Sequence, residues 1–508
     1  MTPRYLDYAA TTPVDPEVAA AMSECLTTQG DFGNPSSAHV FGQRAAARIE
    51  RARAQVAALV GAQPQEIVFT SGATESDNLA ILGCVRANAD RGRHVVTART
   101  EHKAVLDPCH RLEKEGASVT WLTPGRAARI DPAEFAAALR PDTVLASIMF
   151  ANNETGVLED VVAIGALCRE RGIAFHSDCA QAAGKVPLAL NSLPVDFASL
   201  TAHKLYGPKG IGALYVRSGA RGLVQPLLFG GGQERSLRPG TLATHQIVGF
   251  GAACELAVRV LPAESARLLA LRERLWQGLA ALPGTYLNGA AAPRLPGILN
   301  VSFEGVHGES LVAGLAELAL STGAACNSVS PDPSYVLRAL GRNTQLAQGS
   351  LRFSLGRFTD DGDVDLALEA VRRELARLRA LSPAAPPEPE QSDAWRSTAR
   401  AEGLRIVRGE AGGVGQETWV RFELLTDGDT VKEARFRAFA CPDTTQVVAW
   451  LCGALRGRGR AELVPGTPGG WALGRGLPPE KLGRLLIVED ALRACLTAWQ
   501  EALECEER

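Results

Sequence analysis

The chain has 508 residues, of which 46% are hydrophobic and 21% charged, and its formal net charge at pH 7 is −3. This length exceeds one ordinary hydrophobic core, so we expect a soluble globular protein of two or three domains. The slightly acidic balance, without a basic cluster, argues against nucleic-acid binding. No apolar signal region or membrane-spanning run stands out. The eleven cysteines lack C-x-x-C spacing, which favours reduced thiols in the cytoplasm.

Apolar strands alternate with amphipathic helices through the first part of the chain. We expect strands at 66–70, 94–98 and 143–151, each followed by a helix, at 74–89, 101–116 and 160–172. Two further buried runs, GIAFHSD and PVDFASLT, come before residue 202. This alternation predicts an α/β fold with a mostly parallel sheet and helices on both faces. Ligands of such sheets bind beyond the carboxyl ends of the strands.

Polar side chains follow five of the predicted strands. The stretch SGATES at 71–76 opens a helix with small residues, which leave backbone N–H groups free to hold an anion. Any one of the polar residues could be a helix cap or a satisfied polar group. Together they are hard to explain as caps and point to one shared site. They are Thr74, His102, Asn153, Asp178, Gln181, His203 and Lys204.

Lys204 stands where the strand FASLT runs into a Gly-Pro turn. A lone lysine at such a position is usually a surface residue whose amine extends into solvent. The alternative is an amine held in a pocket to form a Schiff base with a carbonyl. Pyridoxal phosphate needs such a lysine, a carboxylate for its ring nitrogen and a helix N-terminus for its phosphate. The strand ends supply all three, so we predict this cofactor on Lys204 and not on Lys209, beyond the turn.

Ten motifs in residues 1 to about 380 resemble the NifS/IscS cysteine desulfurase family, whose members are class V pyridoxal-phosphate enzymes. The resemblance implies the fold type I architecture, with a large domain at about 14–255 and a small α+β domain from 1–13 and 256–380. The motifs, in order, are YLDYAATTPVDPEV, GNPSSAH, FTSGATESDN, TEHKAVL, NNETG, HSDCAQAAGK, HKLYGPKG, GGGQERSLRPGT, STGAACNS and SLRFSLGRFT.

The resemblance also implies roles for single residues. His102 would stack on the cofactor ring and take part in catalysis. Thr241 would reach the phosphate of a neighbouring subunit, which implies a homodimer. Arg352, assisted by Asn34, would bind the substrate carboxylate through paired hydrogen bonds. The remaining cofactor contacts would be Ala73, Thr74, Thr201 and His203 at the phosphate, Asn153 at the ring oxygen, Asp178 at the ring nitrogen and Gln181 beside it.

Cys326 lies in STGAACNSVSPDPS, whose small residues and lack of period predict a loop with an accessible thiol. By resemblance, it would take sulfur from L-cysteine as a persulfide, leaving L-alanine. The sulfur would then pass to an acceptor or scaffold protein for iron–sulfur cluster or other cofactor assembly. Apart from a transient cluster contact at Cys326, no metal is expected. Selenocysteine lyase, which shares the cofactor set, is the alternative.

Cys84, Cys168 and Cys254 are interpreted as core, and Cys179 as packing under the cofactor.

A Pro-rich linker at 381–395 precedes a predicted α+β domain at 396–508. This domain would contain antiparallel strands around a DGD turn, then two helices. It resembles a degenerate iron–sulfur scaffold of the IscU/NifU N-terminal type. Cys441 matches the second cysteine ligand, the third falls at Arg484, and the first falls in GGVGQE. Cys452 and Cys495 lie inside helices. Cys441 could therefore accept persulfide sulfur, or the domain could dock partners and make the chain chiefly an assembly protein.

Overall fold

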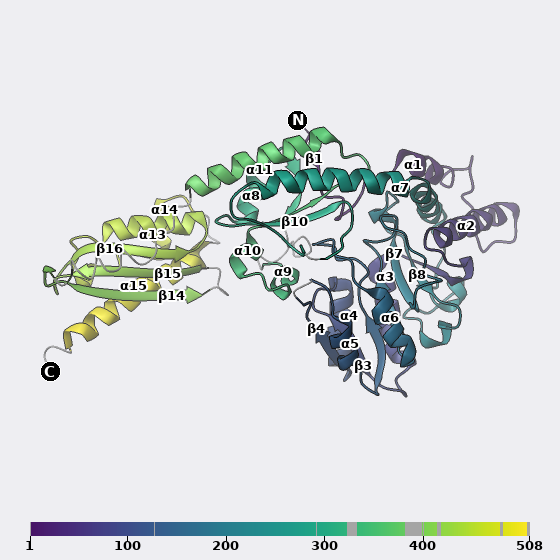
Figure 1. The fold of residues 1–508 in the computed structure, drawn as a ribbon, viewed down its shortest axis with the longest axis horizontal. Coiled ribbons are helices and arrows are strands. Elements are labelled where there is room, and N and C mark those ends of the chain that lie inside the picture. Colours follow the sequence, from purple (N-terminus) through teal and green to yellow (C-terminus); the bar gives the residue numbers. More distant parts are fainter. Residues whose placement is uncertain are drawn as a thin grey trace. The chain divides into compact units, whose positions relative to one another are not determined.

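A computed structural model describes residues 2–125, 128–290, 292–322, 333–381, 399, 401–413, 418–477 and 481–504 (Figure 1). The chain divides into two compact units, Met1–Ser382 and Pro383–Arg508. Cys326 and residues 382–395 of the predicted linker lie outside the described residues.

A seven-stranded sheet forms the centre of the first unit, in the order β2-β8-β7-β6-β5-β3-β4. Strands β3 to β7 pair in parallel, whereas β8 is antiparallel to β7 and to β2. The mostly parallel sheet predicted from the sequence is therefore confirmed. The strands are β2 Ile67–Thr70, β3 His94–Ala98, β4 Ser118–Leu122, β5 Thr143–Ser147, β6 Ala174–Asp178, β7 Phe197–Thr201 and β8 Gly212–Val216.

Successive strand residues point into two hydrophobic cores on opposite faces of this sheet. Phe69 and Val96 pack on one face, beneath α2, α6 and α7, whereas Val68 and Val95 pack on the other, beneath α3 and α4. Cys84, Cys168, Cys179 and Cys254 are buried in these cores, as expected. The helices are α1 Pro16–Ser23, α2 Val40–Leu59, α3 Ala73–Ala87, α4 Lys103–Lys114, α5 Pro132–Ala138, α6 Val161–Glu170 and α7 Thr244–Ala280.

Helix α7 extends from the central sheet to a second, smaller sheet (Figure 1). Its length and composition would suffice to cross a membrane, with a mean hydropathy of 1.3 in its most apolar window. Half of that window is buried inside the fold, where Ile247, Phe250 and Cys254 belong to the core. Its apolar character is thus used in packing against α1, α2 and the sheet.

The smaller sheet has the order β12-β13-β10-β9, and its strands pair antiparallel. The C-terminal half of α7 and helix α11 cover it with a separate core that includes Leu275, Phe303 and Phe353. Strand β1 pairs with β11, which brings the N-terminus to this part of the unit. The elements are β1 Arg4–Tyr5, β9 Thr285–Leu287, β10 Ile298–Phe303, α8 Gly308–Gly314, β11 Leu318–Ala319, β12 Ser321–Thr322, α9 Tyr335–Ala339, α10 Thr344–Gln348, β13 Ser350–Ser354 and α11 Asp361–Leu381.

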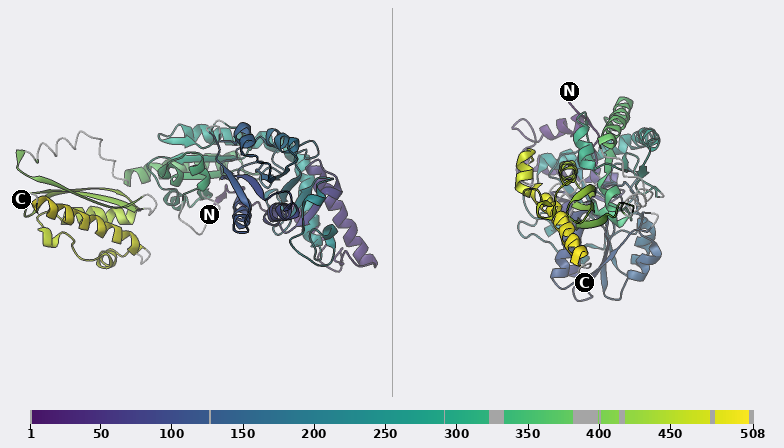
Figure 2. Two further views of the ribbon diagram at one scale, coloured as in Figure 1. Left: turned by 90° about the horizontal axis from the view of Figure 1, so that it is seen from below. Right: turned by 90° about the vertical axis from the view of Figure 1, so that its left-hand side faces the viewer.

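The second unit is a three-stranded antiparallel sheet, β14-β15-β16, with helices packed against it (Figure 2). The predicted strands on either side of the DGD turn are present, and the Asp427 side chain accepts hydrogen bonds from two turn N–H groups. Its elements are β14 Arg405–Gly413, β15 Thr418–Thr426, β16 Val431–Phe439, α13 Pro442–Ala454, α14 Pro468–Gly474 and α15 Leu482–Glu504.

Strand β14 was not predicted, because its sequence RIVRGEAGG has three glycines and weak alternation. One of these glycines has a packing role. A Cβ added at Gly409 would lie 2.1 Å from the backbone nitrogen of Cys495 in α15. The missing side chain therefore lets α15 cross β14 at close range.

We expect Gly409→Ala to destabilise the second unit by about 1–3 kcal/mol, because the helix backbone must move away from the strand. Hydrogen exchange of the α15 amides in the full chain, measured by mass spectrometry, should accelerate. Gly453→Ala is the matched control, since the added methyl at this exposed site in α13 meets no atom within 4 Å. It should stabilise its helix by about 1 kcal/mol. Unchanged α15 exchange in Gly409→Ala would contradict the packing role.

Candidate active site

A cavity of about 600 Å³ lies beyond the carboxyl ends of the parallel strands. This volume suits a cofactor-sized ligand. Parallel strands bring their carboxyl ends to one edge of the sheet, which explains why residues far apart in the sequence meet here. Ten of the predicted site residues line the cavity, namely Ala73, Thr74, His102, Asn153, Asp178, Gln181, Thr201, His203, Lys204 and Arg352.

The N-terminus of α3 forms one wall of the cavity. Strand β2 ends at Thr70, and the helix begins at Ala73 after a Gly72 N-cap that supplies no side-chain cap. The first N–H groups of α3 therefore carry the positive end of the helix dipole without a capping side chain. This wall is suited to an anion such as a phosphate.

His102 is the N-cap of α4, which is why this helix begins at Lys103 and not at residue 101 as predicted. Its Nδ1 accepts the backbone N–H of Ala104 at 3.1 Å, so the ring proton of the neutral form is on Nε2. Burial lowers the pKa of His102 below its ordinary value. The site thus contains a neutral, flat ring with a defined tautomer.

Asp178 ends strand β6 and is buried at the base of the cavity. Burial, together with the nearby Asp77 carboxyl, raises the pKa of Asp178 to about 6. Its Oδ1 accepts the Ala180 N–H at 2.8 Å. A buried carboxylate of this kind is stabilised by a cationic partner, such as a protonated ring nitrogen.

Lys204 lies on a short 3-10 turn, Ala202–Lys204, directly after β7. Its Nζ donates hydrogen bonds to the carbonyl oxygens of Ala9 and Ala10, the latter at 2.9 Å. Beside it, the Nδ1 of His203 is 3.1 Å from the Thr11 hydroxyl. Burial and the Lys204 charge lower the pKa of His203 to about 4, so this ring is neutral at pH 7.

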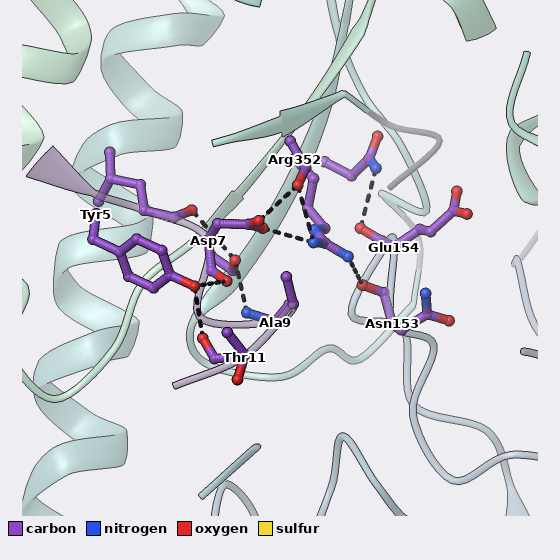
Figure 3. Close-up of polar contacts among 12 residues, drawn as sticks. Tyr5, Asp7, Ala9, Thr11, Asn153, Glu154 and Arg352 are labelled. Carbon is purple, nitrogen blue, oxygen red and sulfur yellow. Dashed lines mark hydrogen bonds and ion pairs between the residues drawn. The ribbon is translucent and has the colours of Figure 1, made fainter. Parts of the chain in front are cut away.

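Arg352 is buried and forms an ion pair with the partly buried Asp7 (Figure 3). From β13 its Nη2 donates to Asp7 Oδ1 at 2.7 Å, and its Nη1 donates to the Asn153 carbonyl at 2.9 Å. The Ser321 hydroxyl donates to the second Asp7 oxygen at 2.8 Å. Among the described residues, the buried Nε of Arg352 has no hydrogen-bond partner. The guanidinium is thus fixed on one side while it also lines the cavity.

Asp7 was not among the predicted site residues, although it lies in the motif YLDYAATT. The sequence feature that could have indicated a role for Asp7 is its charge, which stands among aromatic and small residues. Asn34 and Thr241 are exposed and do not line the cavity of this single chain.

Comparison with known proteins agrees with this geometry. Residues 4–367 match the family model "Aminotransferase class-V". The chain belongs to this family. It is 55% identical over 382 residues to the cysteine desulfurase IscS of Pectobacterium atrosepticum, a match that covers 75% of this chain and 95% of that protein. It is 54% identical over the same length to IscS of Salmonella schwarzengrund, with the same coverage of both.

Solved structures give the same result for the fold. A NifS-like protein matches with a TM-score of 0.69 and 35% identity, covering 74% of this chain and 100% of its own. A structure titled "SspA in complex with cysteine" matches with a TM-score of 0.63 and 38% identity, covering 70% and 100%. The fold type I architecture predicted for the first unit is therefore confirmed.

Class V enzymes of this kind use pyridoxal phosphate, and the cavity fits this cofactor. It combines a helix N-terminus for an anion, a buried carboxylate with a raised pKa and a lysine amine at one sheet edge. The chain is accordingly a pyridoxal-phosphate-dependent enzyme, as predicted.

We expect Asp7→Asn to lower the free energy of unfolding by about 3 kcal/mol, because the Arg352 charge would remain buried without its partner. Glu17→Gln is the matched control. It removes a carboxylate paired with Arg259 at 2.7 Å, but both side chains are more than half exposed, so its loss should be below about 1 kcal/mol. Urea unfolding of the full chain measures both variants, and equal losses would contradict the structural role of the buried pair.

Proposed function

We propose that the chain is an L-cysteine desulfurase that converts L-cysteine to L-alanine and supplies sulfur for iron–sulfur cluster or other sulfur-cofactor assembly. The cavity that collects ten predicted residues around Lys204 carries this proposal. The 55% identity to IscS over nearly the full length of that enzyme supports the same reaction. A solely assembly or docking function would leave this built site without a use.

The cofactor would be held by groups that already line the cavity. Its phosphate would bind at the start of α3, at Ala73 and Thr74, with Thr201 and His203 adding contacts. When bound, it supplies an electron sink beside the substrate α-carbon. The ring would be held by Lys204 through a covalent bond, by Asp178 at its nitrogen, by Asn153 and Gln181, and by His102 against its face.

His102 and Lys204 are the groups placed to move protons. With Nδ1 engaged by the Ala104 N–H, His102 holds its proton on Nε2. The Lys204 amine, when not joined to the cofactor, can exchange a proton with the substrate α-carbon. Both groups line the cavity in which the substrate would react.

Arg352 would bind the substrate carboxylate, with Asn34 assisting. Asp7 and the Asn153 carbonyl hold its two terminal nitrogens, which fixes the plane of the guanidinium. Arg352 lines the cavity, and a guanidinium can donate paired hydrogen bonds to a carboxylate. An amino acid with a free carboxylate is therefore the substrate class that this wall favours.

Cys326 would be the sulfur-accepting nucleophile, although it lies outside the described residues. The cysteines that the structure describes in the first unit are buried, and burial raises the pKa of Cys84 and of Cys168 to about 12. Such thiols are poor nucleophiles at neutral pH. The Cys326 thiolate would attack the substrate sulfur. A sulfur–sulfur bond would form and the carbon–sulfur bond break, with its electron pair left on carbon, which is then protonated to give alanine.

Several finer features belong to the same proposal. Thr241 is exposed and away from the cavity, as required if it serves the phosphate of a neighbouring subunit in a homodimer. We place the enzyme in the cytoplasm, where its thiols would stay reduced. Selenocysteine lyase is the alternative activity, and relative turnover of selenocysteine and cysteine by the purified enzyme would separate the two.

Cys441, in the second unit, would accept sulfur from Cys326. It is the N-cap of α13, and its Sγ lies 3.2 Å from the Thr444 hydroxyl and 3.7 Å from the Lys481 amine. Burial raises its pKa, but hydrogen bonds from Thr444 and Arg484 and the charge of Lys481 outweigh burial and lower it below the ordinary value. Thiolate formation at neutral pH is thereby favoured. Because both cysteines belong to one chain, Cys441 could meet Cys326 at an effective concentration of about 1 mM.

The second unit would then be a degenerate scaffold-like domain. Arg484, in place of a third cysteine ligand, supplies a positive charge that suits a single thiolate better than a cluster. A domain that only docks partners is the alternative.

Cys326→Ala should keep the cofactor and its visible absorbance yet lose at least about 100-fold in sulfide release from L-cysteine, because the attacking thiol is gone. Cys452→Ala, which removes a half-buried thiol in α13, is the control and should retain the wild-type rate. Sulfide release by Cys326→Ala at the wild-type rate would place the nucleophile elsewhere.

Mass spectrometry of peptides after brief exposure to L-cysteine tests the sulfur relay. A persulfide should form on Cys441 in the wild type and be absent in Cys326→Ala. Because the pKa of Cys441 is lowered, labelling should persist as the pH falls towards neutrality. Label confined to Cys326 would show that the second unit docks partners without taking sulfur.

A further inference from the structure

A second lysine amine, that of Lys185, lies behind the proposed active site and has no role in the reaction described above. Lys185 follows the glutamine of the motif HSDCAQAAGK by four residues, in the turn after β6. Its half-buried side chain donates a hydrogen bond from Nζ to Gln181 Oε1 at 2.7 Å. Burial, together with the charges of Lys204 and Arg352, lowers the pKa of Lys185 to about 7.

Lys185 lines a small cavity of about 30 Å³, which has room for about one water. Lys185 and Lys204 both line it. Ala9 and Lys204 also line the large cavity, so the two cavities meet at these residues. Lys185 therefore lies on the side of Lys204 that faces away from the proposed cofactor.

A chain of hydrogen bonds connects the two amines. The Gln181 carboxamide accepts from Lys185 through Oε1 and donates through Nε2 to the Ala9 carbonyl at 2.9 Å. The same carbonyl accepts from Lys204. An ammonium only donates and a carbonyl only accepts, so these neighbours permit one orientation of the carboxamide. The second N–H of Nε2 is then left for the large cavity, which Gln181 lines.

Several charged groups lie near the amines of Lys185 and Lys204. Lys185 lies within electrostatic range of Lys204 and of Arg352. Glu264 of α7 lines the small cavity, but it is paired with Arg357 at 2.9 Å. Asp178 is the acidic group of the large cavity that interacts with the His102 ring. The titratable groups that line the two cavities around Lys204 are Tyr8, Glu75, His102, Asp178, Lys185, His203, Tyr206, Lys209, Glu264 and Arg352.

We propose that Lys185 is a positioning residue: it orients the Gln181 carboxamide so that an N–H faces the cofactor, and its positive charge disfavours a second positive charge on the Lys204 nitrogen. Both effects favour the unprotonated state of the linkage between Lys204 and the cofactor, because a donor stabilises negative charge on the cofactor and, while Lys185 is protonated, like charges repel. The two nitrogens titrate as a coupled pair. This inference rests on the proposal that Lys204 carries the cofactor.

The pH dependence of visible absorbance in the full-length holoenzyme tests the inference. Loss of one charge-assisted hydrogen bond and one nearby cation should raise the midpoint of this titration by about one pH unit in Lys185→Met. Lys185→Arg keeps a charged donor and should restore the wild-type midpoint. Lys114→Met makes the same change at an exposed site at the end of α4 and should leave the midpoint unchanged. If Lys185 had only a structural role, its replacement would leave this midpoint unchanged.

Lys185→Gln provides a second neutral variant if Lys185→Met does not fold, and its midpoint should also rise. A wild-type midpoint in either folded neutral variant would overturn the inference. Borohydride reduction of the holoenzyme followed by peptide mass spectrometry shows separately which lysine carries the cofactor. Modification at a lysine other than Lys204 would refute the proposed site, whereas Lys204 modification with unshifted midpoints would refute only the role of Lys185.

Discussion

The ion pair between Asp7 and Arg352 ties the parts of the first unit into one site. Asp7 follows β1, whereas Arg352 lies on β13 of the smaller sheet and also contacts the backbone of Asn153, in the segment after β5 of the large sheet. A buried guanidinium is tolerated only when its charge and most of its donors are satisfied. Three distant segments therefore have to meet correctly before the arginine can be buried. The contacts that allow Arg352 to be buried therefore also position the residue that would bind a substrate carboxylate.

Burial gives similar side chains different chemistry across this chain. Cys84 is held as a thiol by its hydrophobic surroundings, whereas Cys441 has a hydroxyl and cations within reach that offset its burial. Lys185 likewise has a lowered pKa, because burial and the neighbouring charges of Lys204 and Arg352 disfavour its charged form. The local balance of desolvation and neighbouring charge, more than residue type, decides which groups can take part in a reaction.

The second unit has its own hydrophobic core and its own set of cysteines. Its hydrophobic core, which includes Phe422, Val448 and Trp499, is complete in itself. Of its described cysteines, Cys495 is buried and Cys441 and Cys452 are half-buried, and Cys441 lies at the N-terminus of α13. Cys441 therefore combines partial burial with cationic neighbours, Lys481 and Arg484, whereas Cys495 is enclosed in the core.

The sequence by itself determined the α/β architecture of the first unit and most of its proposed site. Strand-and-helix alternation leaves few topologies, and a polar residue at a strand end has a predictable direction. Asp7, the pairing of β14 and the approach of Lys185 to Lys204 were decided only by the tertiary structure. Each depends on contacts between residues far apart in the chain, such as Asp7 with Arg352 and Gly409 with Cys495. Local periodicity carries no information about such contacts, because they arise from how completed elements pack together.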